Sequence, residues 1–152
     1  QNYIERLWKY MNYPVTFAAL FLASFCLAPM SGAAQADSLA GKYGHNYTEK
    51  NGTPVWEVRQ EGDTYELLSL GNPPSSQEVH VLTADERRHF WQTMWWSEES
   101  SAQVNCIGNT QEVICFVPAT TRQTIAALKE NDSDYFYYDP TGGLMEIQKL
   151  PQ

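Results

Sequence analysis

The sequence predicts a sheet-dominated α+β fold, in which an antiparallel sheet or a small open barrel is built of hairpins and two short α-helices pack on it. Three hairpin patterns indicate the sheet, because β-branched and aromatic runs flank turn-forming residues at 55–70, 104–117 and 135–150. Two capping-box patterns, at 83–86 and 120–123, indicate the starts of the helices. We therefore expect hairpins and helices to alternate along one domain.

The middle hairpin carries two of the chain's cysteines. Apolar runs flank the turn Gly108–Gln111, and each run contains one cysteine. Setting Cys106 opposite Cys115 makes Ile107 face Ile114, so the same register serves the turn and a disulfide. Closing a ring this small contributes about 2 to 3 kcal/mol to stability. We expect this hairpin to lie at the centre of the fold and to be closed by a disulfide.

The two outer hairpins are read from their turns. The first changes direction at Glu61–Asp63 and the last at Asp139–Gly143, and both turns are rich in Gly and Asp. Between the first and middle hairpins, Gly71–Ser76 contains two prolines, which predicts an exposed loop. The short alternating run Glu78–Leu82 then predicts one further strand.

Each predicted helix has an apolar stripe. The first carries Phe90 and Met94 on its buried side, with its arginines toward solvent, and ends at the two adjacent tryptophans. The second follows Pro118, which stops the preceding strand, and extends over 121–130. Its buried face is predicted to be Ile125, Leu128 and the alanines between them.

Residues 1–36 predict a secretory signal peptide. The run Pro14–Met30 contains no charged residue; Arg6 and Lys9 precede it, and the small-residue cleavage pattern at 34–36 follows it. A permanent membrane anchor is the main alternative, although the run is at the short limit for spanning a bilayer.

Two further alternatives concern the same segment. A lipoprotein would be lipidated at Cys26, but the bulky Phe25 stands where such sites have a small residue. Met11 is a candidate start, which would place the first ten residues upstream. The remaining segment, 37–152, is predicted to be a single exported domain, and the hydrophobic content of the chain, 43%, is enough for one packed core.

Charge and cysteine content narrow the class of protein. In residues 37–152, Asp and Glu outnumber Lys and Arg by 9, so no basic surface is available for nucleic acid. An acidic surface favours a basic protein partner. The same segment has only two cysteines, which in an oxidising compartment most simply pair with each other. We expect a periplasmic or secreted protein that meets a membrane only through an uncleaved N-terminal segment.

The sequence offers little support for catalysis, and we predict no catalytic residue, metal or cofactor. His45, His80 and His89 lack the short spacing that metal sites use, and His80 alternates between valines as a surface residue of a strand does. No G-x-S-x-G motif is present. The carboxylate pairs at 98–99 and at 132 and 134 lie in polar connections, which favours solvated charge.

Aromatic residues are more numerous than a two-faced sheet requires. Adjacent Trp95 and Trp96 cannot both point inward from one helix face, and the run 135–138 must expose one of its faces or cover it with a helix. Exposed Trp and Tyr are common anchors of protein interfaces. The predicted partner-binding residues are Trp95, Trp96, Glu98, Glu99, Ser100, Ser101, Tyr135 and Tyr137. The polar loops 72–77 and 97–103 are the natural probes of a partner's cleft.

The segment Leu39–Tyr43, L-A-G-K-Y, resembles the G-x-W entry into the first strand of lipocalins, with Tyr43 where the tryptophan stands. This resemblance implies a barrel and a carrier of an apolar small molecule. In that case Tyr43, Trp56 and the tyrosine run would converge on one internal pocket.

The function that fits this profile best is an exported protein-binding module that inhibits a partner protein. Examples of the class are immunity proteins and inhibitors of cell-wall-degrading hydrolases. The lipocalin-like carrier is the alternative. An enzyme, the third possibility, would need a histidine within reach of a carboxylate or serine in a cleft.

Overall fold

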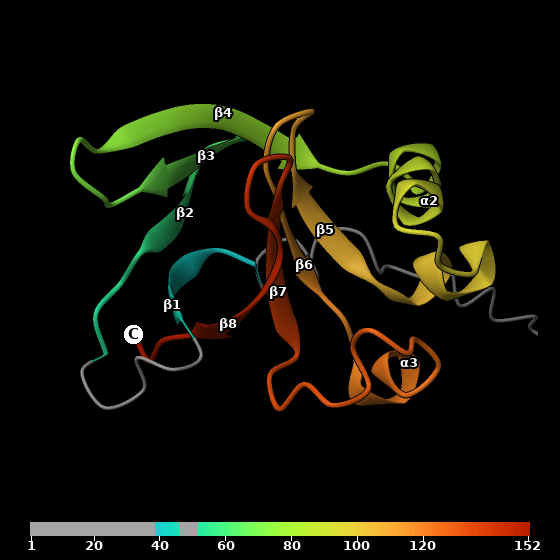
Figure 1. Cartoon of the computed structure of the whole chain (residues 1–152). Coiled ribbons are helices and arrows are strands. Elements are labelled where there is room, and N and C mark those ends of the chain that lie inside the picture. The colour runs from blue at the N-terminus through green and yellow to red at the C-terminus, as the bar shows by residue number, and fades with distance from the viewer. Residues whose placement is uncertain (1–38, 46–51) are drawn as a thin grey trace, which may run out of the picture.

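The computed structural model describes residues 39–45 and 52–152, and these form a closed barrel of eight strands. Each strand pairs antiparallel with the next along the chain, and β1 pairs with β8 to close the barrel (Figure 1). The strands are β1 Gly41–His45, β2 Trp56–Glu61, β3 Thr64–Ser69, β4 Ser75–Val81, β5 Asn105–Gly108, β6 Val113–Phe116, β7 Tyr135–Asp139 and β8 Gly143–Lys149. The predicted sheet-dominated α+β class is confirmed, and the barrel is closed rather than open. The predicted signal peptide lies outside the described residues.

The register of the middle hairpin is the predicted one. Cys106 pairs with Cys115 and Ile107 with Ile114, and a disulfide joins the two cysteines. Both cysteines are fully buried, because helices cover this face of β5 and β6.

Alternation along the strands divides the apolar side chains between the inside and the outside of the barrel. Ile107, Ile114 and Tyr137 point inward. Their neighbours Cys106 and Cys115 point outward, beneath the helices. The inner cluster comprises Leu39, Tyr43, Trp56, Val58, Tyr65, Leu67, Val79, Ile107, Ile114, Tyr137 and Ile147. The outer cluster comprises Leu82, Phe90, Trp91, Val104, Cys106, Val113, Cys115, Val117, Ile125, Leu128 and Phe136.

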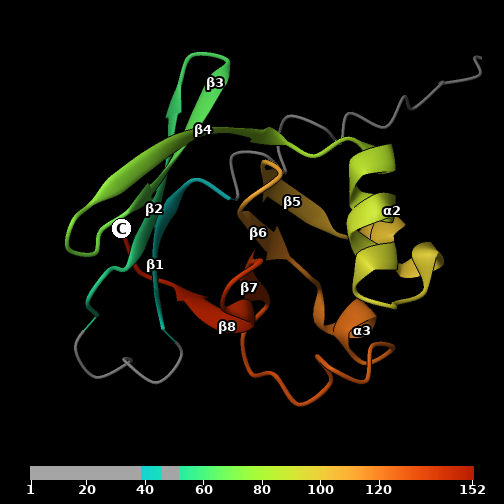
Figure 2. The same ribbon diagram turned by 45° about the horizontal axis from the view of Figure 1, so that its top comes forward.

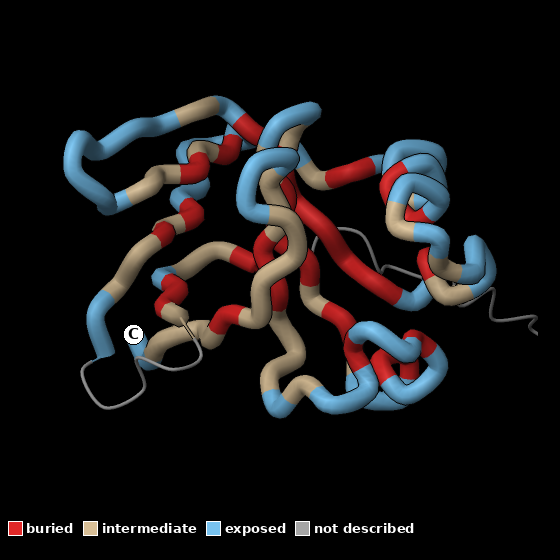
Figure 3. Tube along the Cα trace, viewed as in Figure 1, coloured by how far each residue is buried: buried red, intermediate tan, exposed pale blue. Residues whose placement is uncertain are grey.

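The helices lie on one side of the barrel, and β2, β3 and β4 lie on the other (Figure 2). The helices are α2 (Ala84–Thr93), the 3-10 helix η3 (Glu98–Gln103) and α3 (Ala119–Arg122). Strand β5, which lies between the helices and the barrel interior, is buried along its whole length (Figure 3). No helix in the described part of the chain is long and apolar enough to cross a membrane.

Helix α2 begins with the predicted capping box. The Thr83 hydroxyl accepts a hydrogen bond from the Glu86 backbone N–H, and the Glu86 carboxylate accepts one from the Thr83 backbone N–H. Arg87 departs from the prediction of a solvent-facing side chain. Its side chain is half-buried and donates to the carbonyls of Leu82 and Ser101, which ties the start of the helix to η3.

The second predicted helix is wrong in length and in its cap. Helix α3 is a single turn that follows Pro118, and no side-chain hydrogen bond caps it, so the capping box at 120–123 does not form. The physical reason is Arg122, whose buried guanidinium binds the carbonyls of Asn131 and Ser133 and folds the segment back on itself. Ile125 and Leu128 are buried as predicted, whereas the alanines between them are exposed.

The two predicted probe loops are more ordered than the sequence suggests. Ser75–Gln77 belongs to β4, where it pairs with β3, so the loop of 72–77 is shorter than predicted. The polar connection after α2 is the 3-10 helix η3, because the hydroxyls of Ser100 and Ser101 donate to the carbonyls of Ser97 and Glu98.

The disulfide gives a direct stability prediction. Replacing Cys106 and Cys115 together by alanine is expected to lower the free energy of unfolding by about 2 to 3 kcal/mol, because the unfolded chain regains the freedom that the closed ring removes. Urea unfolding with and without a thiol reductant measures this effect. Reductant should destabilise the wild type and leave the double variant unchanged; equal stability of both proteins without reductant would contradict the prediction.

Candidate functional site

The candidate site is the surface formed where α2 ends and η3 begins, which we call the α2–η3 surface and define by Trp95, Trp96, Ser97, Glu98 and Glu99. These residues are consecutive in the sequence. The structure thus brings together the first four of the predicted partner-binding residues. Their exposure is set by the way in which α2 ends.

Helix α2 ends in a Schellman motif. The backbone N–H of Trp95 donates to the Gln92 carbonyl at 3.0 Å, and that of Trp96 donates to the Trp91 carbonyl at 3.1 Å. The indole of Trp96 packs edge-on against Trp91, with ring centroids 5.1 Å apart, which is the apolar contact that accompanies this motif. The motif requires a left-handed residue, and Trp95 supplies it with φ of 60°.

Trp95 stands where glycine is normally found, and the residue is 95% exposed. A left-handed conformation costs a non-glycine residue about 1 kcal/mol or more, and a ring in water recovers none of that cost by packing. Its neighbour Trp96 is half-buried and lies edge-on to Phe136. The motif therefore fixes one indole in the outer core and turns the other outward.

The acidic residues of the surface differ in their bonding. Glu98 is exposed and accepts a hydrogen bond from the Gln92 amide at 2.5 Å. Glu99 is exposed, and no hydrogen bond or ion pair to it is found within the described residues. Ser100 is half-buried, and its hydroxyl accepts from the Trp91 indole N–H at 2.8 Å.

Three of the predicted partner-binding residues lie elsewhere. Ser101 is buried, because its hydroxyl donates to the Glu98 carbonyl inside η3, so its prediction as a contact residue is wrong. Tyr137 is also buried, since its ring stacks on Trp56 inside the barrel. Tyr135 is half-buried at the same inner cluster, 5.5 Å from the Tyr43 ring. Neither tyrosine belongs to the α2–η3 surface.

The surroundings of the Tyr137 hydroxyl explain how this side chain can be buried in the barrel. Its hydroxyl donates to the Glu112 carboxylate at 2.7 Å. Burial of the ring, and then the adjacent Glu112 carboxylate, raise the pKa of Tyr137 well above its usual value. The phenol therefore stays neutral and acts as a hydrogen-bond donor that fastens the tip of the middle hairpin to β7.

Two hollows adjoin the α2–η3 surface. One has a volume of about 350 Å³ beside Trp95, and its lining includes Met94, Trp96 and the exposed alanines after α3. The other has a volume of about 240 Å³, and its lining is polar and includes Glu99. The two hollows share Ser97 and Thr124 as lining residues, so they lie side by side.

The electrostatic character of this surface is acidic. The chain has no Lys or Arg between Arg88 and Arg122. Arg122 itself is buried, where it pairs with Asp134 at 2.8 Å. The carboxyl end of α2, which carries the negative end of the helix dipole, has no basic residue in its last turn. A cation approaching the surface therefore meets negative charge.

A second hollow region, which the sequence analysis missed, lies between α2 and the tip of the middle hairpin. Its volume is about 450 Å³, and its lining includes Phe90, His89 and Tyr138. The signal that could have found it is the spacing of Glu86, His89, Phe90 and Thr93, which places all four on one face of a helix.

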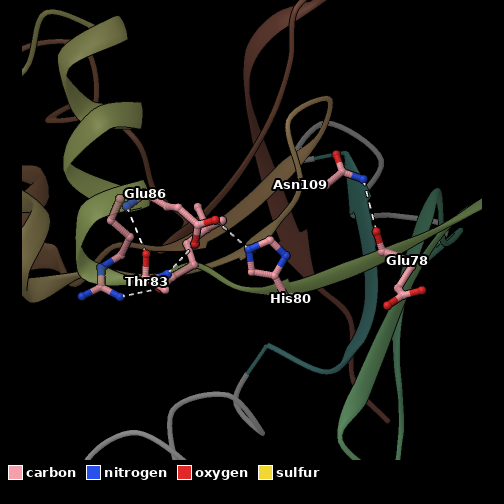
Figure 4. Close-up of polar contacts among 7 residues, drawn as sticks. Glu78, His80, Thr83, Glu86 and Asn109 are labelled. Atoms are coloured by element: carbon pink, nitrogen blue, oxygen red, sulfur yellow. Dashed lines mark hydrogen bonds and ion pairs between the residues drawn. The ribbon is translucent and has the colours of Figure 1, made fainter.

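Polar contacts lie along this groove. His80 of β4 lies 2.9 Å from the Glu86 carboxylate of α2, and His80 is exposed, as predicted (Figure 4). The Asn109 side chain accepts from two backbone N–H groups of the turn and donates to the carbonyl of Glu78, which is also on β4. Figure 4 shows His80 turned toward Glu86 and Asn109 turned toward Glu78, so these are two separate contacts.

The Glu86 carboxylate predicts a pH effect on stability. The Thr83 backbone N–H, and then His80, hold the pKa of Glu86 below its usual value. A lowered carboxyl pKa contributes stability that is present above the unfolded pKa, about 4.3, and is lost as pH falls through the folded pKa. We expect the difference in unfolding free energy between wild type and Glu86→Gln to shrink between about pH 6 and about pH 3. Urea melts at both pH values test it, and a constant difference would contradict it.

The α2–η3 surface offers exposed aromatic and acidic groups, and the groove beside α2 holds a histidine, His80, within reach of the Glu86 carboxylate. Within residues 39–45 and 52–152, no group of three or more His, Cys, Asp or Glu side chains could hold a metal ion. No protein-family model, curated protein or solved structure matches the chain at a significant level. The functional conclusion therefore depends on the α2–η3 surface.

Proposed function

We propose that this chain is an exported protein-binding module that inhibits a partner protein by means of the α2–η3 surface. Immunity proteins and inhibitors of cell-wall-degrading hydrolases are the class of protein it resembles in function. The single observation that carries the proposal is Trp95, which is 95% exposed and held in a conformation that favours glycine. A residue that lowers the stability of its own fold and makes no packing contact in return is explained by an interaction outside the chain.

The geometry around Trp95 supports a protein partner. Hot spots of protein interfaces are enriched in Trp, and they work best when the scaffold holds the ring in place before binding. Here the Schellman hydrogen bonds fix the backbone of Trp95, and Trp96 anchors the next residue in the outer core. The adjoining 350 Å³ hollow provides a place for a side chain of the partner.

Two further observations support the proposed location of the chain and the basic charge of its partner. A buried disulfide is typical of proteins that fold in an oxidising compartment, which supports a periplasmic or secreted location. The excess of acidic residues supports a basic partner.

Affinity capture tests this function. The tagged chain is used to capture proteins from the envelope of the organism that encodes it, and Trp95→Gly is the matched bait. We expect the wild type alone to retain a basic hydrolase, and we expect the purified complex to have lost hydrolytic activity. A partner that both baits retain equally, or a hydrolase that stays fully active in the complex, would contradict the proposal.

A lipocalin-like carrier is the second candidate, and the closed eight-stranded barrel is the observation that favours it. Tyr43, Trp56 and Tyr137 do converge inside the barrel, as that hypothesis predicts. However, the rings occupy the interior themselves, since Trp56 and Tyr137 stack at 4.5 Å between centroids. Titration with a panel of apolar ligands, followed by tryptophan fluorescence, tests the carrier; saturable binding that Trp56→Phe alters would support it.

A further inference from the structure

We infer that the α2–η3 surface receives an arginine side chain that projects from the partner, with the guanidinium at Glu99 and beside the Trp95 ring. This inference rests on the proposed function, because it names the chemistry of the partner at the same site. Three features carry it: the carboxylate of Glu99, the exposed indole of Trp95, and the two adjoining hollows that these residues line.

The two hollows differ in the residues that line them. Beside Trp95 the lining includes Met94, Trp96 and Ile125, whose apolar atoms can contact the hydrocarbon stem of a long side chain. On the other side of Ser97 and Thr124 the lining consists of serines, threonines, Gln103 and Glu99. A long side chain that ends in a cation can lie across both hollows with its charged end at Glu99.

Charge complementarity selects a cation for the polar end. Glu98 shares its carboxylate with Gln92, whereas Glu99 has no hydrogen bond or ion pair among the described residues. The arginines that flank this stretch of the sequence have partners of their own: Arg88 pairs with Asp85, Arg87 donates to the carbonyls of Leu82 and Ser101, and Arg122 is buried against Asp134. Within residues 39–45 and 52–152, no cation of the chain pairs with the Glu99 carboxylate, which is open to a cation supplied by a partner.

Arginine fits better than lysine for two reasons. A guanidinium binds a carboxylate through two parallel hydrogen bonds, and it stacks on the face of an indole. Lysine offers a point charge that cannot make both contacts with the same planar group. An exposed indole and an unpaired carboxylate on the same surface therefore favour arginine over lysine.

Nuclear magnetic resonance of the full chain tests the inference. The indole N–H signal of Trp95 is assigned by comparison with Trp95→Phe and is followed during titration with the peptide acetyl-Gly-Arg-Gly-Arg-Gly-amide. The same peptide with citrulline for arginine is the neutral control, and a lysine peptide is the second control. We expect the arginine peptide to shift the Trp95 signal, the lysine peptide to bind more weakly, and the citrulline peptide to leave the signal unchanged.

Two carboxylate variants localise the effect. Glu99→Gln should weaken binding of the arginine peptide about fivefold, because it removes the charge that faces the cation. Glu61→Gln makes the same charge change on the β2–β3 hairpin, which lies on the far side of the barrel from α2 (Figures 1 and 2), and should have no effect. Equal binding of the arginine and citrulline peptides, or equal binding by the two variants, would overturn the inference.

The outcomes separate this inference from the proposed function. If capture of an inhibited hydrolase depends on Trp95 but the arginine and citrulline peptides bind alike, the proposed function stands and the arginine site is wrong. If the peptides discriminate as expected but the complex retains full hydrolase activity, the arginine site stands and inhibition is wrong.

Discussion

Replacing Trp95 by glycine is expected to weaken partner binding about 100-fold and, at the same time, to raise the free energy of unfolding by about 1 kcal/mol. The two effects have opposite signs because the ring contributes to binding, whereas its backbone opposes folding. Glycine adopts φ of 60° without the steric cost that a Cβ brings, and an exposed ring has no packing to lose. The larger freedom of glycine in the unfolded chain reduces the gain but does not reverse it.

Two control variants separate the effect of the Trp95 ring on binding from the effect of its backbone conformation on stability. Trp95→Ala should weaken binding as much as glycine does without the gain in stability, because alanine keeps a Cβ in the left-handed conformation. Leu70→Ala removes the other large exposed apolar side chain among the described residues and should change neither quantity. Calorimetric titration with the captured partner and urea unfolding give the two readouts. A loss of stability in Trp95→Gly would mean that the ring supports the fold.

The second large effect is expected at Arg122. Replacing it by alanine should lower the free energy of unfolding by about 3 kcal/mol, because it leaves the carbonyls of Asn131 and Ser133 and the Asp134 carboxylate without their donor. The residue is 7% exposed, so water cannot fully replace the lost bonds. The change should also loosen the turns that hold Ile125 and Leu128 in the outer core.

Asp134→Asn is the matched comparison for this prediction. The Asp134 side chain is 42% exposed, so its loss should cost less than the loss of Arg122. Urea unfolding of the two variants measures the difference. If Arg122→Ala cost less than Asp134→Asn, the guanidinium would not be the anchor of this segment.

The hairpins could be predicted from the sequence because their determinants are local. The turn residues and the two cysteines fixed the register of β5 and β6 within a short stretch of chain. Closure of the barrel is a different matter, since it pairs Tyr43 of β1 with Lys149 of β8 at opposite ends of the domain. No local pattern encodes that contact, although the lipocalin-like entry at Leu39–Tyr43 pointed toward a barrel.

The errors have a common physical cause, which is tertiary contact that overrides a local pattern. Alternation placed residues 135 and 137 on one face, but only the closed barrel decides that this face is the inner one, so Tyr137 is buried. The capping pattern at 120–123 was likewise overridden by the buried Arg122. The outward indole, in contrast, followed from local geometry, because two adjacent tryptophans cannot share one helix face.

The central claim is that a partner protein covers the α2–η3 surface. Hydrogen–deuterium exchange of the chain, alone and bound to the captured partner, tests it most directly. We expect slower exchange confined to 92–103 and 119–127, the segments that contain Trp95 and line the two hollows beside it. Slower exchange centred instead on the barrel strands β1, β2 and β7, with the α2–η3 surface unchanged, would contradict the claim.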